Sequence, residues 1–176
     1  MEAFRRNIRV VLGACVALVI QLVLTPALSI AFIRPNALLS FCVVLAIVRP
    51  ANSSLITAFI LGLIGGALST NPLGIMAAVF VAVAFVLCRI FSVLDGNSQI
   101  MAAICIAVSV LLAETVYGFL LIQFGMDVSF PALILYRILP CALYDCVLAY
   151  VLYPLVHRFI GPLATTTQIP LAQQFR

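Results

Sequence analysis

The chain has 176 residues, of which 66% are hydrophobic and 8% are charged, and its net charge is +4. Soluble domains have about half apolar and about a quarter charged residues, so a water-soluble fold of this size could not bury so much apolar surface. The composition therefore excludes an ordinary soluble enzyme or nucleic-acid-binding domain and predicts a membrane protein.

The first half of the chain contains three apolar runs separated by polar turns. Residues 10–33 form the first predicted helix, long enough to cross about 30 Å of hydrocarbon, and Gln21 is its only strongly polar side chain. A cleaved signal peptide is the alternative for this segment, but the run exceeds the usual apolar core of about 7–15 residues. The second predicted helix, residues 36–48, is short for a full span, and the third covers residues 53–69.

Three longer apolar runs follow in the second half. They predict helices over residues 73–94, 99–124 and 130–156, and the last of these carries Pro140 in its interior. We therefore expect an all-α, polytopic protein with six transmembrane helices in one compact bundle. The bundle would occupy residues 1–160, and the polar residues 161–176 would form a flexible cytoplasmic tail.

The arginines predict the orientation of these helices, since cytoplasmic loops of membrane proteins are enriched in basic residues. Six spans place both termini on one side of the membrane. Seven arginines fall on that side, Arg5, Arg6, Arg9, Arg49, Arg89, Arg158 and Arg176, and two on the other, Arg34 and Arg137. The N-terminus and the C-terminus are therefore both expected in the cytoplasm.

Small residues line one side of the third predicted helix and continue into the turn after it. The stripe consists of Ala58, Gly62, Gly65, Gly66, Ser69, Thr70, Leu73 and Gly74. In lipid, such stripes allow two helix backbones to approach closely. The stripe predicts a packing face, used within the chain or by a partner protein. Because a glycine pattern of this kind is a weak signal, both readings stay open.

Three ionisable residues fall within the predicted spans of the second half: Glu114, Arg137 and Asp145. A charged side chain at the bilayer centre costs about 2.5–3.5 kcal/mol on insertion scales, so each needs a partner or a task. At a rise of about 1.5 Å per residue, Glu114 and Arg137 lie at a similar depth in the membrane on two neighbouring antiparallel helices. We expect an ion pair or a shared polar network. A proton relay or substrate site is the alternative.

Motifs for catalysis, cofactor binding and metal binding are missing from the sequence. His157 is the only histidine, and no P-loop, dinucleotide fingerprint or nucleophile elbow is present. The cysteines lie in apolar runs without a CxxC pair and are interpreted as packing residues: Cys15, Cys42, Cys88, Cys105, Cys141 and Cys146. The sequence therefore predicts a non-enzyme without cofactor or metal.

Three motifs in order along the chain resemble those of a known family. They are Arg34-Pro35-Asn36 before the second helix, the glycine-rich segment from Gly62 to Gly74, and Leu139-Pro140 followed by Leu143-Tyr144-Asp145 and Leu152-Tyr153-Pro154-Leu155. Together with the size and span number, they resemble the bacterial rod shape-determining protein MreD family. Two positions depart from the family pattern, because Gly66 replaces a common aspartate and Asp145 a common asparagine.

The resemblance implies a non-catalytic scaffold of the cell-elongation machinery in the bacterial inner membrane, acting on cell shape and peptidoglycan synthesis. Its expected partner is MreC, through which it would be linked to MreB, RodA and the penicillin-binding transpeptidase of RodA. The glycine stripe is the first candidate interface. The second is an outer rim formed by Arg34, Pro35 and Asn36.

Two other functions fit a small membrane bundle. The substrate-binding S component of an energy-coupling vitamin transporter needs a pocket with several convergent polar groups. The predicted outer loops offer mainly Thr70, Asn71, Asp127 and Ser129 for such a pocket. A small ion or proton transporter would depend on the intramembrane carboxylates and predicts that Glu114→Gln abolishes transport.

Overall fold

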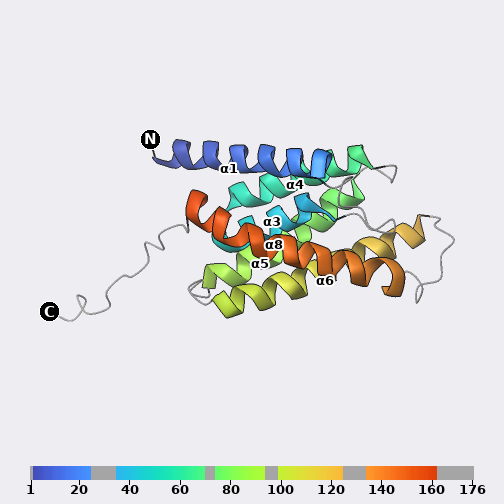
Figure 1. Cartoon of the computed structure of the whole chain (residues 1–176). Coiled ribbons are helices and arrows are strands. Elements are labelled where there is room, and N and C mark those ends of the chain that lie inside the picture. Colours follow the sequence, from blue (N-terminus) through green and yellow to red (C-terminus); the bar gives the residue numbers. More distant parts are fainter. Residues whose placement is uncertain (1, 25–34, 70–73, 94–98, 125–133, 162–176) are drawn as a thin grey trace.

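The computed structural model describes residues 2–24, 35–69, 74–93, 99–124 and 134–161, and all elements in these ranges are helices (Figure 1). In chain order they are α1 Glu2–Val19, η1 Ile20–Leu24, α3 Ala37–Val48, α4 Asn52–Leu68, α5 Ile75–Val93, α6 Gln99–Gln123, η2 Ile134–Ile138 and α8 Leu139–Ile160. The short π-helical segments η1 and η2 adjoin α1 and α8. The predicted all-helical fold is confirmed.

The most enclosed helix is α3. All 12 of its residues are buried, and it packs against α1, α4, α5, α6 and α8. The sequence explains this position, because its one strongly polar side chain is Ser40 and a helix that is apolar all round is normally buried. At about 18 Å it is shorter than the hydrocarbon core, as its sequence suggested, and its longer neighbours surround it.

The last helix differs in detail from its prediction. Pro140, expected in a helix interior, is the second residue of α8, and because η2 leads into α8 without a break, it lies inside the continuous helical segment from Ile134 to Ile160. The proline inside α8 is Pro154, and the helix continues to Ile160 before Gly161 ends it with a φ of +65°. Glycine adopts this left-handed conformation readily, which makes it a common helix terminator.

Three helices, α5, α6 and α8, are long and apolar enough to cross a membrane by length and composition. The other apolar helices are shorter and cover Asn7–Val23, Ala37–Val48 and Asn52–Leu68. Six spans, as predicted from the sequence, would require these three to cross as well.

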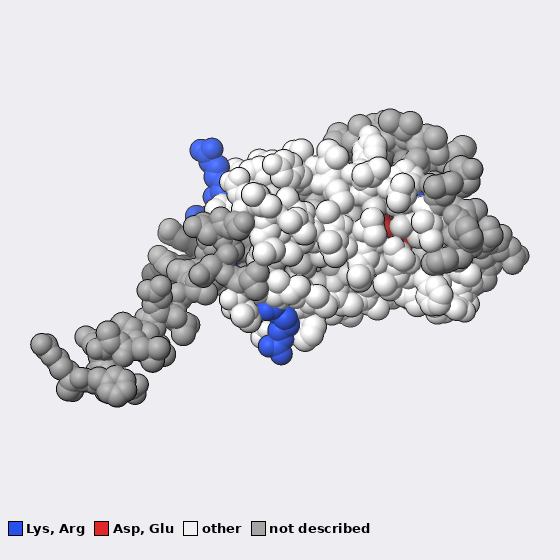
Figure 2. Space-filling model, turned by 90° about the horizontal axis from the view of Figure 1, so that it is seen from below, with Lys and Arg blue, Asp and Glu red and all other residues white. Residues whose placement is uncertain are grey.

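The described ends of the chain lie at the same end of the bundle (Figure 1). A guanidinium N–H of Arg9 donates to the backbone carbonyl of Phe159 over 3.4 Å, which places the start of α1 beside the end of α8. Figure 2 shows arginine side chains projecting near this end from a surface that is otherwise largely uncharged. Basic residues therefore mark one end of an apolar bundle.

Candidate functional site

The polar centre of the bundle is built at the N-terminal end of α3. A helix leaves its first N–H groups without partners inside the helix. Here the Asp145 carboxylate accepts the N–H of Asn36, and the side-chain oxygen of Gln21 accepts the N–H of Ala37 over 2.7 Å. The Asn36 side chain accepts the N–H of Leu39 over 3.2 Å. The end of α3 is thus hydrogen-bonded inside the apolar core, where unsatisfied backbone groups are costly.

Asp145 joins α8 to α3 by two separate hydrogen bonds. Besides its carboxylate contact, its backbone carbonyl accepts the hydroxyl of Ser40 over 3.0 Å, and both residues are fully buried. The carboxylate lies at the positive end of the α3 dipole, where a negative charge is stabilising. Its second oxygen, Oδ2, has no hydrogen-bond partner among the described residues. Asp145 therefore joins α8 to the start of the central helix through both its side chain and its backbone.

The opposite end of α3 carries the complementary charge. Arg49 is the residue that caps this end, and its buried guanidinium donates to the side-chain oxygen of Asn7 over 2.9 Å. The backbone carbonyl of Arg49 accepts the hydroxyl of Ser54 over 2.6 Å. A cation near the C-terminus of a helix is favourable for the same reason as an anion near its N-terminus. Asp145 and Arg49 thus match both ends of the α3 dipole.

The three ionisable residues singled out in the sequence lie in one region. Glu114 is buried on α6, Asp145 is buried on α8, and Arg137 is exposed on η2. α6 packs against both η2 and α8. Arg137 acts electrostatically on Glu114, and Glu114 acts on Asp145, so Glu114 links the other two residues. A direct ion pair between Glu114 and Arg137 stays a prediction.

The glycine side of α4 faces α5. A Cβ atom at Gly62 would lie 2.5 Å from the Cα atom of Ala77, and one at Gly65 would lie 2.9 Å from the sulfur of Met76. The first contact is with backbone, which has no flexible end that can move aside. A Cβ at Gly66 would meet nothing closer than 3.8 Å, which is ordinary contact. Gly62 therefore sets the distance between α4 and α5.

Other members of the predicted stripe have different surroundings. Ala58 is buried on α4, and the half-buried Ser69 donates its hydroxyl to the carbonyl of Gly66 over 3.0 Å. Gly74 has a φ of +99°, which side-chain-bearing residues rarely adopt, and it precedes α5. Thr70 and Leu73 lie outside the described residues.

The predicted outer rim has a different place in the structure. Pro35 is buried, and Asn36 is only 9% exposed because its backbone and side chain both bond at the start of α3. Arg34 lies outside the described residues, as do residues 162–176 of the predicted tail. Asn36 is thus a capping residue inside the bundle rather than part of an accessible rim.

Metal-binding clusters and disulfides are both missing from the described residues. No group of three or more histidine, cysteine, aspartate or glutamate side chains in them could hold a metal ion. The six cysteines all lie in described helices, and none forms a disulfide there.

Two features of the sequence are partial signals for this site. Asn36 directly before an apolar run is a typical helix start, and Gln21 stood out as a polar residue in an apolar segment. Neither signal showed that Gln21, Asn36 and Asp145 meet at one helix end.

The comparison with protein families matches residues 4–161 to the family described as rod shape-determining protein MreD. The match includes all of α3, α4 and α8 and the polar centre. Neither a curated protein nor a solved structure matches the chain.

Proposed function

Because this chain belongs to the family of the rod shape-determining protein MreD, we propose that it is a non-catalytic membrane scaffold of the bacterial cell-elongation machinery. It binds MreC, and through MreC it is linked to MreB, to RodA and to the penicillin-binding transpeptidase of RodA. In this role it contributes to the control of cell shape and peptidoglycan synthesis.

The family match over residues 4–161 carries this proposal, and the distribution of polar groups supports it. The polar side chains with the clearest bonding roles, such as Asp145 and Ser40, bond inside the bundle. The outward side chains of the helices are mostly apolar, including Phe59, Phe85 and Val147. A protein built in this way offers partners its intramembrane helix faces and the ends of its helices.

The position of α5 restricts where MreC can bind. The glycine side of α4 is already filled within the chain, since Gly62 lies against the backbone of Ala77. The opposite side of α4 exposes apolar side chains: Ile56, Phe59, Ile60 and Leu63. In this proposal the small residues hold α4 in place, and MreC uses another helix face.

We further propose six spans in the inner membrane with both termini in the cytoplasm. The contact between Arg9 and Phe159 supports an even number of crossings, because it joins the beginning of the first helix to the end of the last. The excess of arginines on the terminal side supports a cytoplasmic location for that end.

Affinity purification of the tagged full-length chain from native membranes in mild detergent tests the proposed function. We expect MreC to co-purify and rod shape to be lost when the protein is depleted. Recovery of a bound vitamin with an energy-coupling module, instead of MreC, would identify a transporter component. Loss of an ion flux in Glu114→Gln, with normal cell shape, would likewise contradict a scaffold.

A further inference from the structure

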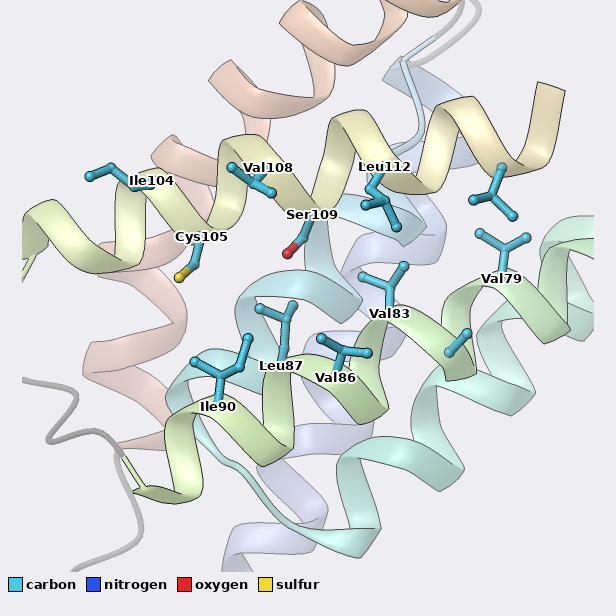
Figure 3. A pocket seen from close by; sticks show the side chains of 12 residues that line it. Val79, Val83, Val86, Leu87, Ile90, Ile104, Cys105, Val108, Ser109 and Leu112 are labelled. Carbon is cyan, nitrogen blue, oxygen red and sulfur yellow. The ribbon is translucent and has the colours of Figure 1, made fainter. Parts of the chain in front are cut away.

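An apolar groove opens between α5 and α6 on the outside of the bundle (Figure 3). It has a volume of about 270 Å³. Val83 and Ile90 of α5 line one wall, and Cys105, Val108 and Ser109 of α6 line the other. Figure 3 shows side chains of the two helices pointing toward each other across the gap. The groove forms where the small Ser109 and Cys105 side chains leave space between larger apolar neighbours.

The length of the groove is close to the thickness of one leaflet, and the groove lies along the middle of α5. Its α5 wall runs from Val79 to Ile90, which is about 16 Å at a rise of about 1.5 Å per residue. Half of a hydrocarbon core of about 30 Å is about 15 Å. Val86 and Val108 in its walls are more than half exposed, so the groove is open toward the surrounding lipid.

The turn of α5 at the Ile90 end of the groove also carries an arginine. Arg89 directly precedes Ile90, and its exposed side chain is in the last turns of α5. The guanidinium lies 5.4 Å from the centre of the Phe85 ring, and within the described part of the chain it forms no ion pair. Arginine binds phosphate through two parallel N–H groups, and its long side chain can reach the membrane surface from within the hydrocarbon.

We propose that the α5–α6 groove binds one acyl chain of an anionic phospholipid of the cytoplasmic leaflet, with the lipid phosphate held by Arg89. The groove supplies apolar contact over a length of about 16 Å, and the arginine supplies the complementary charge at the membrane surface. This inference is independent of MreC binding.

The shape of the groove favours an acyl chain over a helix of another protein. A helix with its side chains is about 10–12 Å wide, whereas packed helices have axes about 8–10 Å apart. A helix could therefore insert only single side chains between α5 and α6. A partner helix would also need an acidic residue at the depth of Arg89, whereas a lipid carries the negative charge on its own phosphate.

Binding of phosphatidylglycerol and phosphatidylcholine with identical acyl chains to the purified full-length protein tests the proposal. Native mass spectrometry or a thermal-shift titration measures both affinities. Since one arginine near an anionic surface contributes about 1 kcal/mol, we expect about fivefold tighter binding of phosphatidylglycerol. Arg89→Gln should abolish this preference. The matched control is Arg158→Gln, an exposed arginine on α8 outside the groove, which should retain it.

A second variant tests the apolar part of the site. Ser109→Leu should fill the groove and weaken binding of both lipids, while Arg89→Gln affects only the preference for the anionic headgroup. Equal binding of the two lipids by the unmodified protein would overturn the proposal. The proposal would also be overturned if Arg158→Gln removed the preference for phosphatidylglycerol as fully as Arg89→Gln. A photo-crosslinker at Val108 that captures a protein helix in native membranes, and no lipid, would also overturn it.

Discussion

Replacement of Gly62 by alanine should separate α4 from α5 and destabilise the bundle. The new Cβ atom would lie 2.5 Å from the Cα atom of Ala77, and ordinary contact begins at 3.4 Å, so the backbones must move apart by about 0.9 Å. A gap of about 0.5–1 Å loses a quarter to a half of the dispersion energy between the surfaces that it separates. The damage therefore extends along the interface beyond the substituted residue.

Gly66→Ala is the matched control for this change. Both glycines lie in α4, so both alanine variants gain the same helix propensity of about 1 kcal/mol over glycine. A Cβ at Gly66 meets its nearest atom at 3.8 Å and fits without movement. Overpacking costs about 1–3 kcal/mol, so Gly62→Ala should be less stable than Gly66→Ala by about 2 kcal/mol. For a chain of this size, that corresponds to a difference in Tm of about 4–8 °C.

Thermal unfolding in detergent can be followed with a dye that fluoresces on reaction with thiols. Cys42 is 3% exposed and Cys88 is 9% exposed, so both react when the bundle opens. Equal Tm values for Gly62→Ala and Gly66→Ala would show that the backbone contact between α4 and α5 does not limit stability. That result would refute the assignment of Gly62 as the spacer between these helices.

Five further substitutions test the polar centre and the charged residues near it. Asp145→Asn keeps an oxygen acceptor for the start of α3 and should retain most of the stability, whereas Asp145→Leu leaves a buried N–H unsatisfied and should lose about 1–3 kcal/mol in thermal unfolding. Gln21→Leu removes the second acceptor and should cost a similar amount; an unchanged Tm would show that this hydrogen bond is not needed. For Glu114→Gln and Arg137→Gln, a double-mutant cycle should give a coupling of about 0.5–3 kcal/mol if the charges attract, and purely additive effects would contradict the predicted pair.

The helices themselves could be predicted well from the sequence, because apolar runs and polar turns set their limits. The burial of α3 also agrees with its sequence, since its side chains are almost all apolar on every side of the helix. The change from the π-helical η2 to α8 at Leu139, directly before Pro140, was less predictable. Hydrophobicity alone does not distinguish these helical forms.

The contacts of the site were harder to predict because their partners are far apart in the chain. Asp145 and Asn36 are separated by 109 residues, and only the packing of α8 on α3 brings them together. The glycine stripe was visible in the sequence, but Gly62 and Gly66 occupy equivalent positions in that pattern. The difference between them depends on where Ala77 crosses α4, which a pattern within one helix does not contain.

The labelling of single cysteines with a membrane-impermeant maleimide tests the membrane arrangement, on which the scaffold and the lipid site both depend. Ala3→Cys and Gln174→Cys near the two ends, and Ser129→Cys in the predicted outer loop, would be introduced into a variant without the native cysteines. We predict that intact cells protect positions 3 and 174 and expose position 129. Labelling of positions 3 and 174 from opposite sides would contradict the even number of crossings and the orientation together.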